Sequence, residues 1–355
     1  MIARDDLRAA VGSGLLTEKQ AADLVSLADS RRGARENLLP GDEPFELFKG
    51  FNEIFIVIGL IILATGWVSV TALTLGNDII NLRGYAVSVT VMAAGILWML
   101  SEYFVRKRRM IAPAIALAVM FGINPIIGFL ALLGEPFMIV QGDYFSATLP
   151  VLLTTLVLLI YWWRFRVPIA MAMIAIGLFI AATVLAASQG GEVRDISDLF
   201  LLSAGGPFAW ITLVLGVLVF AVAMAFDMSD PHRVTRRSAN GFWLHVVAAP
   251  ALVNTVALSL LDQGTAGANI VLLGFLALFA VVAIVIDRRS FLIAAIGYIV
   301  TLAATVLNGD GAALTVLFLG IALLLLGAFW ERIRARVLGL LPGIVPLHRL
   351  PPSQV

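Results

Sequence analysis

Long apolar segments recur through this chain, and the connections between them are alternately rich in positive charge and nearly free of it. Each segment is close to the roughly 20 residues that a helix needs to cross the core of a bilayer. The ten segments are Phe51–Leu73, Gly84–Phe104, Met110–Leu133, Ser146–Trp163, Pro168–Ser188, Pro207–Phe226, Gly241–Leu261, Ala268–Ile286, Ser290–Leu307 and Gly311–Trp330. We therefore predict an all-α protein, a polytopic membrane helix bundle of ten transmembrane helices.

The positions of lysine and arginine predict the orientation of this bundle. Of the 24 Lys and Arg residues, only Arg83 and Arg194 fall in the connections of one side, and the other 22 fall on the opposite side. Basic connections are retained in the cytoplasm. Both termini are therefore expected to be cytoplasmic.

The overall composition excludes an ordinary soluble domain. Hydrophobic residues make up 61% of the chain and charged residues 13%, and the mean hydropathy is +0.99, far from the averages of soluble proteins. The chain has no cysteine, which excludes disulfides and thiol chemistry. His232 and His348 have no ligand residues at the spacing of a metal site. We therefore expect no cofactor, no metal ion and no enzymatic activity.

Composition shifts divide the chain into four regions. Residues 1–32 are expected to form a cytoplasmic helical hairpin, 33–50 a linker, 51–330 the ten-helix transmembrane domain, and 331–355 a cytoplasmic interfacial helix with a Pro-rich tail. The second helix of the hairpin should start at the capping box Thr17–Gln20. The first fifty residues hold seven basic and nine acidic side chains, so a DNA or RNA backbone would be repelled as much as attracted. A cytoplasmic protein partner of residues 1–32 is the better expectation, with no nucleic acid bound.

Two stretches near the N-terminus carry a family resemblance: Gly14–Ala21 (GLLTEKQA) and, after a linker, the glycine-containing first span Ile58–Trp67. The N-terminal region resembles that of a bacterial family of multi-pass inner-membrane proteins of unknown function with an N-terminal cytoplasmic helical hairpin. The resemblance covers about the first 70 residues. It implies the bacterial inner (cytoplasmic) membrane as the location, and it implies no activity.

Two asparagines and two prolines mark a candidate cavity in the membrane. Asn124 and Pro125 lie in the third segment, and Pro250 and Asn254 lie at a similar depth in the seventh, which runs in the same direction. Proline frees a backbone carbonyl, and interrupted helices form the midplane binding sites of many transporters. The alternative is that each asparagine bonds a neighbouring helix and the prolines are ordinary kinks.

Ionisable side chains are scarce within the predicted spans. Asp227 and Asp287 are expected at inner helix ends, and His245 about one turn inside the seventh span. We interpret His245 as an interfacial residue bonded to a headgroup, to water or to a nearby carbonyl. The alternative is a proton relay.

Membrane lipids are the other expected partners. Two clusters on the inner side are candidate contacts for anionic lipid: a loop cluster, and a basic stripe opposite the apolar face of the last helix. They comprise Arg106, Lys107, Arg108, Arg109, Arg332, Arg334 and Arg336.

These observations leave two functions of different classes. A permease or flippase for a neutral or amphipathic solute would use the third and seventh helices, with Asn124 and Asn254 as hydrogen-bonding groups. A non-catalytic scaffold or regulatory subunit would dock its partners through residues 1–32 and use the bundle as an anchor.

Overall fold

The computed structural model describes residues 10–17, 51–75, 81–135, 144–190, 195–204, 206–231, 236–289 and 324–341, with a few isolated positions beyond them. Over these residues the regular elements are helices, and eight are long and apolar enough to cross a membrane. This indicates an integral, multi-pass membrane protein. The predicted spans Ser290–Leu307 and Gly311–Trp330 lie outside the described residues, apart from the last part of the second. The linker and most of the hairpin lie outside them as well.

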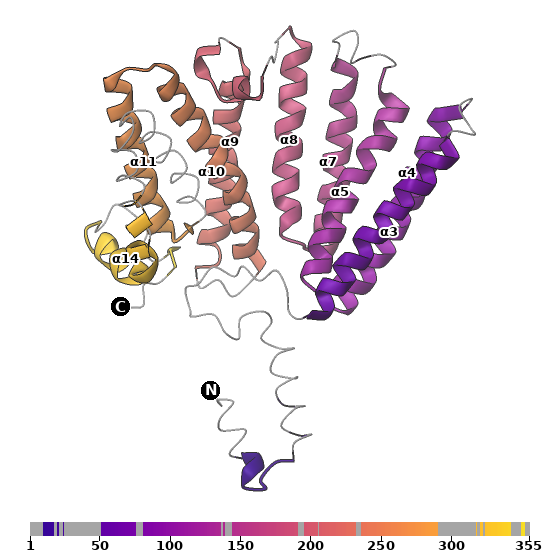
Figure 1. The fold of residues 1–355 in the computed structure, drawn as a ribbon, viewed down its shortest axis with the longest axis horizontal. Coiled ribbons are helices and arrows are strands. Elements are labelled where there is room, and N and C mark those ends of the chain that lie inside the picture. Colours follow the sequence, from indigo (N-terminus) through magenta and orange to yellow (C-terminus); the bar gives the residue numbers. More distant parts are fainter. Residues whose placement is uncertain are drawn as a thin grey trace.

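The eight helices stand side by side and alternate in direction (Figure 1). They are α3 (Phe51–Leu75), α4 (Leu82–Ser101), α5 (Ala112–Leu133), α7 (Phe145–Phe165), α8 (Ile169–Ser188), α9 (Phe208–Met228), α10 (Arg236–Asp262) and α11 (Ala266–Ile286). A π-helical turn, η2 (Glu102–Lys107), prolongs α4. Two short 3₁₀ helices, η3 (Ile196–Leu199) and η4 (Leu202–Ala204), precede α9, and the short helix α14 (Trp330–Gly339) packs against α11. We call the end of the bundle that carries the basic connections the inner end.

Polar side chains satisfy the free N–H groups at several helix starts. Asn81 Oδ1 accepts the Gly84 N–H at the start of α4, and Thr265 does the same for α11. The buried Glu53 carboxylate of α3 accepts the N–H groups of Ile111 and Ala112 at the start of α5. In the N-terminal region, Thr17 and Gln20 form the predicted capping box in both directions.

An aromatic cluster packs the first half of the bundle. Trp98 of α4, Phe121 of α5, and Tyr161 and Phe165 of α7 have ring centroids 4.6–6.2 Å apart. The hydroxyls of Tyr161 and Ser101 lie 2.9 Å apart inside this cluster. Because lipid is as apolar as these side chains, close packing and internal hydrogen bonds have to hold the helices together.

Helix α8 occupies the middle of the bundle and packs against α5, α7, α9 and α10 (Figure 1). Gly177 permits the close approach of α7, since a Cβ there would lie 2.3 Å from Thr155 Oγ1. At the inner end, Trp162 Nε1 donates to Asn240 Oδ1 at 3.4 Å, which joins α7 directly to α10. The two halves of the described bundle are therefore connected both through α8 and across it.

Single-cysteine variants test the orientation, because the chain has no native cysteine. Cysteines at the exposed positions Asp195 and Asp262 should react with a membrane-impermeant maleimide in spheroplasts. Cysteines at the exposed inner-end positions Arg109 and Arg336 should react only after permeabilisation, as the charge distribution requires. The opposite labelling pattern at both pairs would reject the orientation.

Candidate functional site

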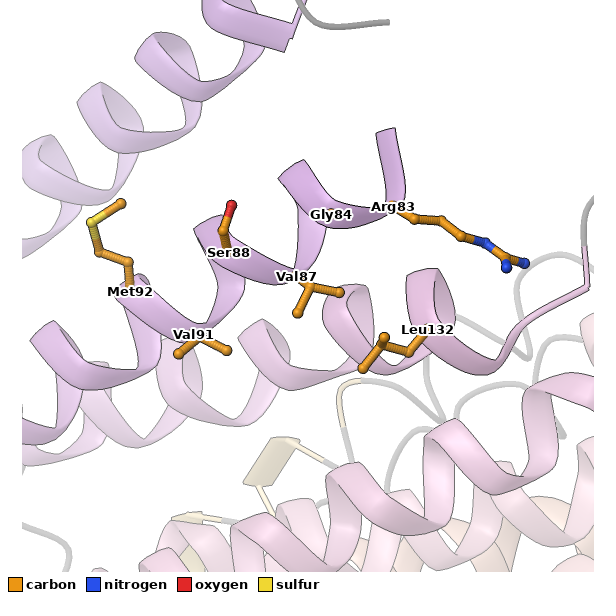
Figure 2. Close-up of a pocket in the computed structure, with 7 residues that line it drawn as sticks. All are labelled: Arg83, Gly84, Val87, Ser88, Val91, Met92 and Leu132. Atoms are coloured by element: carbon orange, nitrogen blue, oxygen red, sulfur yellow. The ribbon is translucent and has the colours of Figure 1, made fainter. Parts of the chain in front are cut away.

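A groove on the lipid-facing side of α4 is the first candidate site (Figure 2). It follows one face of the helix from Arg83 to Met92, and Leu132 of α5 faces it. The lining also includes Gly84, Val87, Ser88 and Val91, and the groove is open along its length and has a volume of about 560 Å³. Its wall is apolar and its one charged side chain lies at the outer end, so it fits an amphipathic molecule better than a polar solute.

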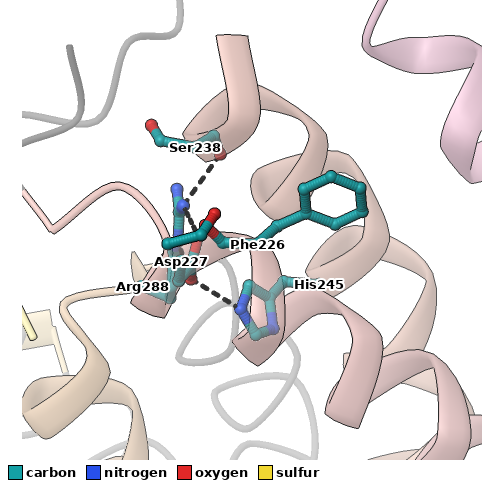
Figure 3. Close-up of polar contacts among 6 residues, drawn as sticks. Phe226, Asp227, Ser238, His245 and Arg288 are labelled. Carbon is teal, nitrogen blue, oxygen red and sulfur yellow. Dashed lines mark hydrogen bonds and ion pairs between the residues drawn. The ribbon is translucent and has the colours of Figure 1, made fainter. Parts of the chain in front are cut away.

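A cluster of charged side chains at the inner end of the bundle is the second candidate site (Figure 3). Asp227, near the end of α9, has its Oδ2 2.9 Å from His245 Nε2 of α10 and accepts a hydrogen bond from Arg288 Nε at 3.0 Å. Arg288 Nη2 pairs with the other carboxylate oxygen and also donates to the Ser238 carbonyl at 2.9 Å. We call Asp227, Ser238, His245 and Arg288 the inner charge cluster.

The end of α11 places Arg288 in this cluster. Asp287 adopts the left-handed conformation, with φ 56° and ψ 50°. Its N–H bonds the Ile284 carbonyl, and the Arg288 N–H bonds the Ala283 carbonyl, which is the pair of bonds of a Schellman motif. Aspartate tolerates this conformation better than most residues. The left-handed Asp287 therefore ends α11, and the side chain of the next residue, Arg288, lies buried in the bundle.

The inner charge cluster is closed to solvent. The exposed fraction is 5% for Asp227 and 0% for both His245 and Arg288. Gly241 lets the backbone of α10 reach the carboxylate, because a Cβ there would lie 2.2 Å from Asp227 Oδ1. The carboxylate and guanidinium balance each other's charge, yet removing both from water still costs several kcal/mol per ion.

A second set of buried polar contacts joins α14 to the end of α11. Trp330 Nε1 donates to Asp287 Oδ1 at 2.6 Å, and the Arg289 guanidinium lies 5.3 Å from the centre of the Trp330 ring. Arg334 Nε donates to the Ile284 carbonyl at 3.2 Å. Residues 287–289, which we call the 287–289 turn, therefore contact α9, α10 and α14.

The structure separates the residues of the predicted cavity. Asn124 and Pro125 lie in α5, Pro250 and Asn254 lie in α10, and α8 stands between these helices. Asn124 Nδ2 donates to the Thr90 carbonyl of α4 at 2.9 Å, so it bridges two helices. A cavity shared by the two asparagines stays a prediction, and the Asn124 bond supports the bridging alternative.

Most of the candidate lipid contacts at the inner end are exposed, as an interaction with lipid headgroups requires. Lys107 and Arg108 lie over the Tyr103 ring, and Arg106 pairs with Glu102 at 3.1 Å. The exposed members of the predicted set are Arg106, Lys107, Arg108, Arg109, Arg332 and Arg336.

Arg334 departs from the prediction, because it is 1% exposed and bonds the last turn of α11. Burial lowers the pKa of its guanidinium, and the nearby Asp287 and Glu331 carboxylates oppose that shift. The free carbonyls at the end of a helix attract a cation. Where α14 packs against the end of α11, Arg334 is the residue that bonds such a carbonyl, that of Ile284. The amphipathic pattern of α14 does not by itself identify which arginine turns inward.

Sequence reasoning missed the convergence of Asp227, His245 and Arg288. It located His245 near the inner end but interpreted it as interfacial, whereas the structure buries it against a carboxylate. The available signal was their common depth, since all three lie near inner helix ends on helices that are consecutive in the chain. Over the described residues, no group of three or more His, Cys, Asp or Glu side chains could hold a metal ion.

No protein-family model, curated protein or solved structure matches the chain. The family resemblance of the N-terminal stretch therefore stays a prediction. Any functional assignment rests on the two sites described above.

Replacement of both asparagines tests whether they share an environment. Asn124→Leu should lower the melting temperature, corresponding to about 0.6–2 kcal/mol for a lost bond between helices. Because α8 separates α5 from α10, the Asn124→Leu and Asn254→Leu effects should add within about 0.5 kcal/mol. A thermal-shift series in detergent measures both quantities. Strong non-additivity in the double variant would instead support a cavity shared by the two asparagines.

Proposed function

We propose that this chain is a multi-pass permease or flippase of the bacterial inner (cytoplasmic) membrane that moves a neutral or amphipathic solute. In this proposal the inner charge cluster is a latch that holds the inner ends of α9, α10 and α11 together in the state described here. The observation that carries it is the buried contact of Asp227 with His245 and Arg288.

The energetic balance of a buried ion pair supports a role beyond stability. Apolar residues of similar volume in place of such a pair often leave a protein equally or more stable. Ionisable residues at membrane depth are costly and concentrate on substrate and ion pathways. A cluster that three helices close off from solvent is therefore better explained by function than by packing alone.

The nature of the contact also suits a latch. Two apolar surfaces that separate must be covered again by lipid or by other side chains, whereas separated charges at the inner end of a bundle can be hydrated. The pairing of Asp227 with Arg288 is therefore a contact with two favourable arrangements, paired and solvated. Switching proteins depend on elements with two such discrete arrangements.

A non-catalytic scaffold or regulatory subunit is the second candidate. The capping box at Thr17–Gln20 defines a helix start in the N-terminal region, and Leu15 and Leu24 there are exposed. Exposed leucines beside a capped helix would suit a protein partner. In that case the inner charge cluster would be a permanent tie between helices.

Paired neutralisation of the cluster separates the two roles. Arg288→Met alone leaves the buried Asp227 carboxylate without its guanidinium, with only His245 beside it, and should cost about 3–5 kcal/mol, whereas Asp227→Leu with Arg288→Met should recover most of that loss. If the cluster is a latch, the stable double variant should lose solute movement. Melting curves measure the first effect. Dithionite bleaching of a fluorescent phospholipid in proteoliposomes measures movement of an amphipathic probe.

Accessibility supplies a readout that does not depend on the solute. Ser238 is fully buried, so a Ser238→Cys variant reacts with a maleimide only when the cluster opens. It should react slowly in the otherwise unchanged protein and severalfold faster in the variant that also carries Asp227→Leu and Arg288→Met. The labelling rate of the exposed Arg336→Cys is the reference for both. Tyr161→Phe, which alters a buried bond in the other half, should change neither rate nor movement. An unreactive Ser238→Cys in every background, with no lipid movement, would favour the scaffold.

A further inference from the structure

The groove on α4 combines an apolar wall with a cation at its outer end (Figure 2). From Gly84 to Met92 it follows about two turns of helix, or roughly 12 Å along the axis. Its volume of about 560 Å³ lies within the roughly 300–1,000 Å³ of sites that hold small ligands. Val87 and Val91 project toward Leu132 of α5, and Gly84 and Ser88, one helical turn apart, place small residues along the same face of α4.

Arg83 is held in place, but most of its hydrogen-bond donors are not used. The preceding Asn81 caps α4, and Arg83 Nη2 donates to the Gly134 carbonyl at the end of α5 at 3.3 Å. A guanidinium has five N–H donors, so this single bond leaves most of them available. Over the described residues, no carboxylate forms an ion pair with Arg83.

The charges at the outer end favour an anion at this position. The other described charged residues there are acidic: Glu135, Asp195, Asp198 and Asp262. An anionic molecule is therefore repelled by much of this surface and attracted at Arg83. Arginine also suits a phosphate group, which accepts two parallel N–H bonds from its planar fork.

We infer that the α4 groove binds a phospholipid of the outer leaflet that carries an anionic headgroup. The headgroup phosphate lies at Arg83, which stands at the outer start of α4, and one acyl chain follows Val87, Val91 and Leu132 toward the membrane centre. This inference does not depend on the proposed transport activity, because a bound lipid of this kind would serve a scaffold equally well.

Site-specific quenching tests this binding in the full chain. Ser88→Cys, labelled with a bimane fluorophore in proteoliposomes, places the reporter at the groove. Brominated phosphatidylglycerol should quench it at about two- to fivefold lower mole fraction than brominated phosphatidylcholine, as expected for a partly solvated ion pair. Arg83→Gln should abolish the preference and Arg83→Lys should keep part of it, since lysine retains the charge but not the fork.

Matched controls distinguish a site from general lipid contact. Val214→Cys reports on the lipid-facing side of α9 and should show no preference between the two lipids. Val91→Trp fills the groove while Arg83 stays, and should reduce the preference, whereas Val214→Trp in the Ser88→Cys background should not. Melting temperatures confirm that each variant is folded. Equal quenching by both lipids at Ser88, or a preference that survives Arg83→Gln, would show bulk lipid only and overturn the inference.

Discussion

The pairing of Asp227 with Arg288 governs the arrangement of the second half of the described bundle. It joins the end of α9 to the turn that follows α11, and the Arg288 bond to the Ser238 carbonyl adds the start of α10. In the same turn, Asp287 holds Trp330 of α14. Residues 287–289, at the end of α11, therefore contact α9, α10 and α14, and the left-handed conformation of Asp287 lies at the centre of this turn.

The two halves of the bundle use different physical means to hold their helices together. Aromatic rings and the hydroxyls of Ser101 and Tyr161 pack α4, α5 and α7, whereas buried charges join α9, α10 and α11 at the inner end. Lipid offers no hydrophobic driving force between helices, so each half depends on contacts that lipid cannot replace. Separated charges gain more from hydration than separated aromatic rings and hydroxyls do, and for this reason we assign the mobile element of the proposed permease to the second half.

Much of the fold follows from one-dimensional patterns. Eight of the ten predicted spans coincide with helices, and the capping box at Thr17–Gln20 forms as predicted, because apolar length and local hydrogen bonding are properties of short segments. The start of α10 was placed too late, at Gly241 instead of Arg236, because the inner extension of this helix is polar. The two remaining spans lie in residues that the structure does not describe, apart from the last part of the second.

The candidate site was harder to predict, for a geometric reason. Sequence gives the depth of a residue in the membrane but not which neighbouring helix it faces. Asn124 and Asn254 have similar depths yet lie on helices separated by α8, whereas Asp227, His245 and Arg288 converge. The inward turn of Arg334 depends likewise on where α14 meets α11.

A charge swap measures the central contact most directly. Asp227→Arg and Arg288→Asp each place two like charges together in a buried site, so each single variant should melt far below the unchanged protein. If Asp227 and Arg288 pair as described, combining the two substitutions should recover a clear part of the lost melting temperature, despite the loss of the Ser238 bond. A double variant that is no more stable than the worse single variant would contradict the account.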